Sequence, residues 1–566
     1  MSAARRDARR ARAAARWQSP GRVKLAIAGF AIVYLAIAGR LVQLAVAPDA
    51  EAKARAGAAA SLAVSRPDIV DRNGQMLATD IQVTSIFAEP RKLIDVDEAV
   101  ELLTATLPDL NARELRQKLS TQRGFEWVKR EVNPREQAEV HRLGIPGIGF
   151  LPEKRRIYPN GPVVSHLLGF VNVDNEGIAG IEKYLDTKNL VDRTGKTAAS
   201  LQPVRLAVDL DVQHAVRDEL AKAQAKFKAI AATGIVTDVN TGEIVAAVSL
   251  PDFDPNNPGE ANDPTRINRV NVGVYEMGST FKALTLAMGL DSGKITLNSS
   301  FDARAPLYYG RFRIDDFHPT RRVLTVPEVF VHSSNIGTAK IALAMGVDHH
   351  KWFLKKVGQL DRLRTELAES SAPIVPARWG ELNTVTIAFG HGLSVAPLQT
   401  VMATAALMNG GKLIPPTVLA RTAAEAEPLA KRVIKPETSQ MMRYLMRLNA
   451  EKGSARKADI PGYRVGGKTG TAEKVVGGRY SSERVMCAFT AVFPSDAPRY
   501  QLLVMLDEPK GLPETHGFRT SGWNAAPTTG AIVERIAPLL GVKPRFDAPS
   551  AADIVASIGG LRGIPR

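Results

Sequence analysis

The longest run of apolar residues lies near the start of the chain. Between Leu25 and Ala47 only Arg40 carries a charge. A helix of about 23 residues is roughly 35 Å long, which exceeds the hydrocarbon thickness of a bilayer, about 30 Å. We therefore predict a transmembrane helix at residues 25–47. A cleaved signal peptide is the alternative, since Ala45-Val46-Ala47 has the form of a cleavage site, but the length of the run and Arg40 favour an uncleaved anchor.

The pattern changes after a stretch rich in Ala, Lys, Glu and Arg at residues 48–65, which we expect to be a helix or stalk. From residue 66 onward, short apolar runs between turn signals predict strands, and Asn73-Gly74 indicates a hairpin turn. Small helices are predicted near residues 98–107 and 112–119. Residues 66–205 contain no grouping of catalytic or metal-ligating residue types, so we interpret residues 48–205 as a non-catalytic α+β pedestal domain.

A second boundary is predicted near residue 205, where a larger α+β domain begins. It should extend over residues 206–545, with strands at both ends and helices between them, so that its first and last segments share one sheet. The predicted helices are residues 212–227, 279–290 and 525–540, and the predicted strands are 231–239, 243–249, 464–473, 485–493 and 500–507. Residues 546–566 are expected to form a loosely ordered C-terminal tail.

The net charge of +16 suggests nucleic-acid binding, but its distribution argues against that function. Residues 1–24 hold eight basic residues and one acidic residue, and the remaining excess is spread over the rest of the chain. A basic tail before an apolar helix is typical of a membrane anchor whose N-terminus stays in the cytoplasm. The single cysteine, Cys487, excludes an intrachain disulfide, and its apolar surroundings predict a packed core thiol.

The first chemistry-bearing motif is Ser279-x-x-Lys282, at the start of an apolar, helix-like run. Positions three apart lie on one helical face, so the hydroxyl and the amine can meet. A serine becomes a nucleophile when a base takes its proton, and a desolvated lysine can be that base. The motif alone is weak, because about two copies arise by chance in a chain this long. A second copy, Ser454-x-x-Lys457, lies in a charged, loop-like stretch, and we assign it to the surface.

Two further motifs follow. Ser333-x-Asn335 lies inside a predicted helical region, residues 326–344, where a helix cap or polar turn is the simpler explanation. The other is Lys468-Thr469-Gly470-Thr471, whose glycine-rich surroundings also fit the letter of a nucleotide-binding phosphate loop. That interpretation requires a buried strand before the loop and a helix after it, and neither is predicted here, so we reject it.

Taken together and in this order, the three motifs resemble the signature of the penicilloyl-serine transferases, the fold class of serine β-lactamases. Residues 25–545 as a whole resemble the class B penicillin-binding proteins, which consist of an anchor, a pedestal and a transpeptidase domain. The resemblance extends to motifs at residues 66–74, 156–169, 177–182 and 389–399. Ser333-Ser334-Asn335 is similar to the division-specific members, since elongation-specific relatives usually carry Ser-Cys-Asp there.

The resemblance implies a role for each motif residue. Ser279 would attack a carbonyl, Lys282 would accept its proton, Ser333 would relay that proton, and Asn335 would hold the substrate amide. Backbone N–H groups of Ser279 and Thr471 would form the oxyanion hole, whose loss typically reduces the rate by roughly 10²–10³ per donor. The implied catalytic residues are Ser279, Lys282, Ser333, Asn335 and Lys468, and the implied substrate-binding residues are Thr469, Gly470 and Thr471, with Lys468 also holding the substrate carboxylate.

The implied function is peptidoglycan D,D-transpeptidation at the division septum, on stem peptides that end in D-Ala-D-Ala. β-Lactams would acylate the same serine, and no metal or organic cofactor is needed. The implied location is the bacterial inner membrane, spanned once, with the catalytic domain in the periplasm. Implied partners are the bilayer, an FtsW-type glycosyltransferase and other division proteins, and not nucleic acid.

Several alternatives stay open from the sequence. An elongation-type transpeptidase has similar motifs, and a D,D-carboxypeptidase or β-lactamase would pass the acyl group to water instead. No segment before residue 206 resembles a glycosyltransferase, which argues against a bifunctional class A enzyme. The non-enzymatic alternative is a catalytically silent division scaffold or a β-lactam sensor, against which the intact motif residues argue.

Overall fold

The computed structural model describes residues 20–46, 65–192, 201–546, 550–551 and 554. Beyond the helix at residues 20–46, the described residues divide into two compact units, a small unit of residues 82–155 and a large unit of residues 65–81, 156–192, 201–546, 550–551 and 554. The stretch expected to form one pedestal is therefore divided between them. Most of the predicted stalk and most of the C-terminal tail lie outside the described residues, but Ala551 and Ile554 of the tail are buried in the core.

The predicted membrane helix is present as α2 (Pro20–Val46). Its segment Val23–Val42 has a mean hydropathy of 2.1, and none of it is buried against the rest of the protein. Within the described ranges, α2 is the one helix long and apolar enough to cross a membrane. An apolar helix exposed along its length needs a partner other than water, and a bilayer provides one.

The small unit folds around its own core. The two helices predicted near residues 98–107 and 112–119 are confirmed as α4 (Val96–Thr106) and α5 (Ala112–Leu119). At the N-terminus of each helix, a side chain accepts hydrogen bonds from backbone N–H groups of the first turn, that of Asp95 in α4 and that of Asn111 in α5. Leu103 and Leu107 are fully buried in the core of this unit. Its elements are the second half of β2 (Met76–Ala88), α4 (Val96–Thr106), α5 (Ala112–Leu119), β3 (Glu126–Val132), α6 (Pro134–Arg142) and most of β4 (Ile148–Ile157).

The large unit is built on a five-stranded antiparallel sheet with the order β16-β17-β18-β6-β7. The last strand in sequence, β18, pairs with β6 from Tyr500 opposite Asp238 to Asp507 opposite Ala231. The prediction that the two ends of this domain share one sheet is therefore confirmed. The five strands are β6 (Ala231–Asp238), β7 (Ile244–Leu250), β16 (Gly466–Val476), β17 (Arg479–Phe493) and β18 (Tyr500–Asp507).

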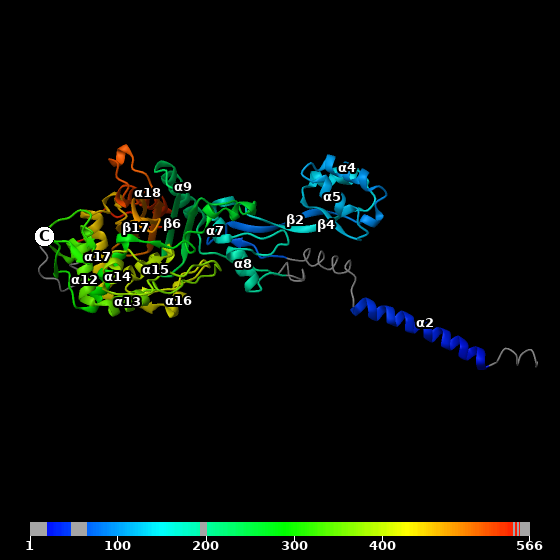
Figure 1. The fold of residues 1–566 in the computed structure, drawn as a ribbon, viewed down its shortest axis with the longest axis horizontal. Coiled ribbons are helices and arrows are strands. Elements are labelled where there is room, and N and C mark those ends of the chain that lie inside the picture. Colours follow the sequence, from blue (N-terminus) through cyan, green and yellow to red (C-terminus); the bar gives the residue numbers. More distant parts are fainter. Residues whose placement is uncertain (1–19, 47–64, 193–200, 547–549, 552–553, 555–566) are drawn as a thin grey trace, which may run out of the picture. The chain divides into compact units, whose positions relative to one another are not determined.

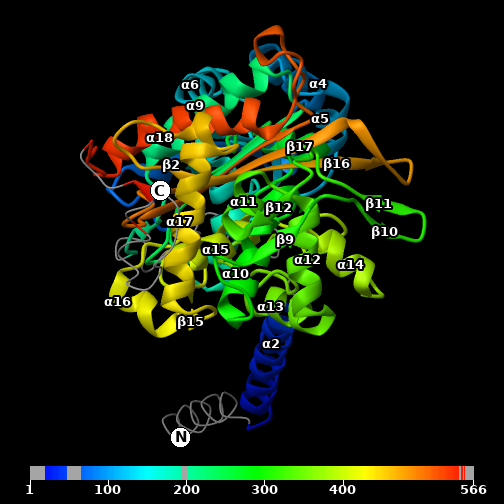
Figure 2. The same ribbon diagram turned by 90° about the vertical axis from the view of Figure 1, so that its left-hand side faces the viewer.

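Helices cover both faces of this sheet (Figures 1 and 2). On β18, Leu503 and Met505 face one core and Leu502 and Val504 face the other, as the two-residue period of a strand requires. The helices α9 (Leu210–Lys226) and α18 (Ala525–Leu539) pack in the second core, and α10 (Lys282–Ser292), α15 (Pro397–Met408) and α17 (Pro436–Lys452) pack in the first. The Ser-x-x-Lys motif therefore lies at the start of α10, a helix of the larger core.

Shorter elements connect these layers. The remaining helices of the large unit are α7 (Ser165–Leu168), α8 (Gly180–Thr187), α11 (Val326–Val331), α12 (Asn335–Met345), α13 (Val347–Lys356), α14 (Glu381–Ala388) and α16 (Ala423–Ala426). Its short strands are β1 (Ile69–Val70), β5 (Val204–Arg205), β8 (Tyr275–Glu276), β9 (Ser300–Asp302), β10 (Leu307–Tyr309), β11 (Phe312–Ile314), β12 (Val323–Thr325), β13 (Ser394–Val395), β14 (Lys412–Leu413) and β15 (Lys431–Arg432).

A buried ion network ties residues 65–81 to residues 156–192 within the large unit. The fully buried guanidinium groups of Arg66 and Arg156 both contact the carboxylate of Glu182, each at 2.7 Å, and Arg156 also contacts Asp80 at 3.1 Å. Removing one member of such a network leaves a buried charge without its partner and typically costs about 3–5 kcal/mol. The network therefore holds these two stretches together as one piece.

Candidate active site

The Ser-x-x-Lys motif lies at the start of α10. Ser279 is half-buried in a 3₁₀ turn (Gly278–Phe281), and Lys282, the first residue of α10, is fully buried. Residues three apart on a 3₁₀ turn lie on the same side. Within the described part of the chain, the hydroxyl of Ser279 makes no side-chain hydrogen bond, and the Lys282 amine donates to Ser333 instead, so the expected hydrogen bond between Ser279 and Lys282 is not formed in this structure.

Ser333 lies in a break between two helices, which corrects the prediction of one helical region at residues 326–344. α11 ends at Val331, α12 begins at Asn335, and Ser333 between them has a φ of 54°. This left-handed conformation costs an L-residue roughly 1–2 kcal/mol. It turns both the carbonyl oxygen and the hydroxyl of Ser333 toward Lys282, whose Nζ donates to both, at 3.1 Å to the hydroxyl.

Lys468 approaches the same hydroxyl from β16. Its Nζ lies 2.9 Å from Ser333 Oγ and 3.2 Å from the carbonyl oxygen of Thr469. Two fully buried lysines therefore meet at one serine. Burial lowers the pKa of Lys468 to about 7. Burial, and then the charge of Lys468, lower the pKa of Lys282 well below its usual value. A neutral amine is therefore available at this site near neutral pH.

A loop without any motif holds the Ser-x-Asn turn. Asp316, which is 7% exposed, accepts hydrogen bonds from Ser334 Oγ at 2.8 Å and from the backbone N–H of Ile336 at 2.9 Å. The side-chain amide of Asn335 donates to the carbonyl oxygen of Asp315 at 2.9 Å. Nothing in the sequence pointed to Asp316, since a lone acidic pair in a charged loop carries no signal for this role.

The Lys-Thr-Gly strand lies directly against the turn that carries Ser279. A Cβ at Gly470 would lie 2.5 Å from the carbonyl oxygen of Met277, closer than real Cβ contacts occur. A Cβ at Gly278 would lie 3.1 Å from the backbone nitrogen of Thr471. The backbone of Thr471 therefore runs beside Gly278, the residue that precedes Ser279.

The two threonine hydroxyls of this strand each have a protein partner. Thr469 Oγ1 lies 2.7 Å from Ser454 Oγ, and Thr471 Oγ1 accepts from the backbone N–H of Ser521 at 3.1 Å. Ser454 is exposed, as predicted for the second Ser-x-x-Lys copy, but it lies at the Lys-Thr-Gly strand rather than on a remote surface.

A third sequence region completes the surroundings of Ser279. The backbone N–H of Gly278 donates to the carbonyl oxygen of Gly390 at 3.2 Å. Glu276 accepts from the backbone N–H of Gly392 at 2.8 Å and from the hydroxyl of Tyr480 at 3.0 Å. Burial raises the pKa of the Glu276 carboxyl. The motif at residues 389–399 thus supports the turn that carries Ser279.

The structure also tests two other interpretations of the sequence, a phosphate loop at Lys468 and a packed thiol at Cys487. Lys468 and Thr469 lie inside a paired strand, β16, and not in a loop before a helix, so the phosphate-loop interpretation is excluded. Cys487 is fully buried, its thiol donates to the carbonyl oxygen of Arg519 at 2.9 Å, and burial raises its pKa to about 12, which confirms a core thiol. Among the residues that the structure describes, no group of three or more His, Cys, Asp or Glu side chains could hold a metal ion.

Comparison with known proteins gives the family. Residues 232–534 match the penicillin-binding protein transpeptidase domain, and residues 61–198 match the penicillin-binding protein dimerisation domain. The chain is 42% identical over 500 residues to the probable peptidoglycan D,D-transpeptidase FtsI of Caulobacter vibrioides, covering 86% of this chain and 84% of that protein. It is 32% identical to the probable peptidoglycan D,D-transpeptidase PenA of Neisseria meningitidis, with 87% of each chain covered.

A solved structure supports the fold. The crystal structure of a peptidoglycan synthetase from Bifidobacterium adolescentis matches with a TM-score of 0.66 and 23% identity, covering 87% of this chain and 98% of that one. The three motifs meet in one site, and both the matched domains and the relatives indicate the same family. The chain belongs to the class B penicillin-binding proteins.

Proposed function

We propose that the protein is a peptidoglycan D,D-transpeptidase of the division septum that works through an acyl-serine intermediate on Ser279. The observation that carries this proposal is the meeting of the buried amines of Lys282 and Lys468 at Ser333 Oγ, with Ser279 on the preceding turn. The names of the relatives from C. vibrioides and N. meningitidis support the reaction class, and the first also supports the division role.

In the acylation step, Ser279 Oγ attacks the carbonyl carbon of the penultimate D-Ala of a stem pentapeptide. Neutral Lys282 takes the hydroxyl proton, and the new oxyanion lies between the backbone N–H groups of Ser279 and Thr471. The peptide C–N bond then breaks. The proton passes through Ser333 to the leaving nitrogen, and D-Ala departs as a free amino acid.

The Lys-Thr-Gly strand and Asn335 would position the substrate. Lys468, with the hydroxyls of Thr469 and Thr471, would bind the terminal carboxylate, and Gly470 allows the strand to approach the turn that bears Ser279. Asn335 would hold the substrate amide. These groups orient the scissile bond before any charge develops, which is where much of the rate enhancement of such sites arises.

In the second step, the amine of a neighbouring stem attacks the ester carbonyl. Its proton goes to Lys282, the ester C–O bond breaks, and Ser279 regains its proton, which leaves a cross-linked peptide. A β-lactam would acylate Ser279 by the same first step. Its leaving nitrogen stays tethered through the opened ring, so the acceptor amine cannot take its place.

The same proposal includes the location and the partners. Helix α2 would span the inner membrane once, with the basic N-terminal tail in the cytoplasm and both units in the periplasm, as the bias in Arg and Lys favours. The partners would be an FtsW-type glycosyltransferase and other division proteins. A protease added outside spheroplasts should digest the large unit, and protection from digestion would contradict this orientation.

The nucleophile is tested by labelling with a fluorescent penicillin to saturation. Ser279→Ala should abolish labelling, while Ser454→Ala, which alters the serine of the second Ser-x-x-Lys copy, should still label fully. The reverse pattern would reassign the nucleophile, and an unlabelled wild-type protein would favour a silent scaffold.

Two further experiments separate the enzymatic alternatives. A stem pentapeptide given with an acceptor amine should yield the cross-linked product, whereas hydrolysis alone would indicate a D,D-carboxypeptidase. Cells depleted of the protein should grow into filaments without septa. Swelling into spheres would indicate an elongation role instead.

A further inference from the structure

The second Ser-x-x-Lys copy lies in the turn that follows α17. Ser454 precedes a short 3₁₀ helix (Arg456–Ala458), and its hydroxyl lies 2.7 Å from the hydroxyl of Thr469. Ser454 is exposed, whereas Thr469 is 9% exposed. Apart from Ser454, no described side chain forms a hydrogen bond with the hydroxyl of Thr469, the group proposed to bind the substrate carboxylate.

The position of Ser454 relative to β16 is fixed by a buried side chain. Asn449, at the end of α17, donates from Nδ2 to the carbonyl oxygen of Gly467 at 2.7 Å and accepts at Oδ1 from the backbone N–H of Ser454 at 3.2 Å. Asn449 is fully buried. One amide therefore ties the Ser454 backbone to the Lys-Thr-Gly strand, so the contact between Ser454 and Thr469 does not depend on a loose loop.

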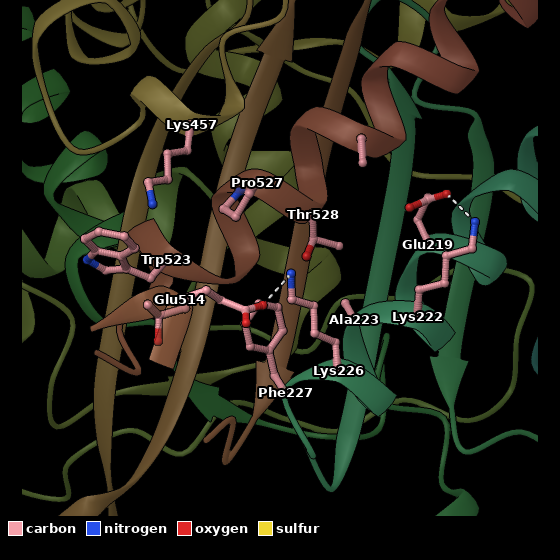
Figure 3. Close-up of a pocket in the computed structure, with 12 residues that line it drawn as sticks. Glu219, Lys222, Ala223, Lys226, Phe227, Lys457, Glu514, Trp523, Pro527 and Thr528 are labelled. Atoms are coloured by element: carbon pink, nitrogen blue, oxygen red, sulfur yellow. Dashed lines mark hydrogen bonds and ion pairs between the residues drawn. The ribbon is translucent and has the colours of Figure 1, made fainter. Parts of the chain in front are cut away.

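The other end of the motif is fixed as well. The ammonium group of Lys457 lies over the ring of Trp523, 3.2 Å from its centroid, at the edge of a cavity of about 330 Å³ (Figure 3). Trp523 follows Ser521 in a 3₁₀ turn (Ser521–Trp523), and it is Ser521 that donates its backbone N–H to Thr471. The turn at residues 454–457 is thus held at both ends by the parts of the structure that contact Thr469 and Thr471.

The direction of the hydrogen bond between Ser454 and Thr469 decides whether the Thr469 hydroxyl can donate to a substrate carboxylate. A hydroxyl has one proton to donate, and a carboxylate only accepts. Thr471 accepts from the backbone N–H of Ser521, and its hydroxyl also contacts the Cys487 thiol. The proton of Thr469 is free for the substrate only if Ser454 is the donor in their mutual hydrogen bond.

We infer that Ser454 is a positioning residue for the carboxylate subsite. Its hydroxyl donates to Thr469 Oγ1, so that the Thr469 proton points to the terminal carboxylate of the donor peptide or of a β-lactam. This inference rests on the function proposed above. Hydrogen bonds in such a chain polarise one another, and the loss of a typical one corresponds to a rate change of about three- to tenfold.

The test is a double-mutant cycle read out as the second-order rate constant of acylation by a penicillin. Ser454→Ala should lower this rate about three- to tenfold, and Ser454→Thr, which keeps the hydroxyl, should restore it. In a Thr469→Val background, Ser454→Ala should have no further effect, because its contribution passes through the Thr469 hydroxyl. The methyl ester of the same penicillin, which lacks the carboxylate, should react equally with wild type and Ser454→Ala.

Arg456→Ala is the matched control, since Arg456 is exposed on the same turn, and it should leave all rates unchanged. An unchanged rate in Ser454→Ala, or an equal loss with and without the Thr469 hydroxyl, would overturn the inference. Failure of the proposed function is a different result, because then the wild-type protein would form no adduct at Ser279.

Discussion

Replacing Gly470 by alanine tests how closely the Lys-Thr-Gly strand must approach the turn that carries Ser279, the proposed nucleophile. The new Cβ would lie 2.5 Å from the carbonyl oxygen of Met277 and 2.8 Å from Thr280 Cγ2, against ordinary contacts of 3.4 Å or more. The Thr280 methyl can rotate away, but the Met277 carbonyl belongs to the backbone that leads to Ser279. Strand and turn must therefore separate by about 0.9 Å, the difference between 3.4 and 2.5 Å.

A displacement of about 1 Å at a reacting centre reduces a rate by roughly 100-fold. Gly470→Ala should therefore lower the acylation rate constant by about that factor, while an overpacked contact of this kind costs only about 1–3 kcal/mol of stability. The assay is the rate of fluorescent-penicillin labelling, with thermal unfolding measured in parallel. Gly380→Ala is the control, because a Cβ at Gly380 would contact nothing within 4 Å. An acylation rate within threefold of wild type in Gly470→Ala would refute this reasoning.

Three further predictions concern proton transfer, support of the site and the core. Burial lowers the pKa of Lys282 well below its usual value, so this base should be neutral at pH 7 and should be lost only on acidification. The acylation rate should therefore be close to its maximum at pH 7 and fall at acid pH, and a rate that rises steadily between pH 7 and about pH 10, as an ordinary lysine would require, would contradict this. Asp316→Ala leaves two buried donors of the Ser-x-Asn turn without an acceptor, so it should lower the free energy of unfolding by about 1–3 kcal/mol per donor and slow acylation. Denaturant unfolding measures the first effect and the rate of penicillin labelling measures the second. A variant as stable as wild type would contradict this role of Asp316. Cys487 should resist iodoacetamide in the folded protein and react in urea, since burial raises its thiol pKa to about 12; fast reaction without urea would show an exposed thiol.

The sequence predicted those parts of the site whose chemistry is local. Ser279 and Lys282 are three residues apart, so their proximity follows from any helical turn, and the apolar run after them predicted a buried helix. The strand that carries the third motif was also predictable, because apolar runs at both ends of the domain predicted strands that share one sheet. The meeting of Lys468 with Ser333 was expected only through the family resemblance, since no local pattern links positions 135 residues apart.

What could not be predicted depends on tertiary contacts. Residues 326–344 are compatible with a continuous helix, and the break at Ser333 is stabilised by Lys282 and Asp316, which come from other segments. The division of the expected pedestal has a similar cause, because Arg66 meets its buried partner Glu182 116 residues later in the chain. The charged neighbours of Ser454 correctly predict an exposed side chain. Its contact with Thr469 could not be predicted, because the two residues are 15 positions apart and no local pattern links them.

The central claim is that one hydroxyl, at position 279, becomes esterified. Peptide mapping by mass spectrometry of the full-length protein after treatment with a β-lactam tests this directly. The adduct should lie on the peptide that contains Ser279, at one per chain. An adduct on any other residue, or none after saturating treatment, would contradict the account.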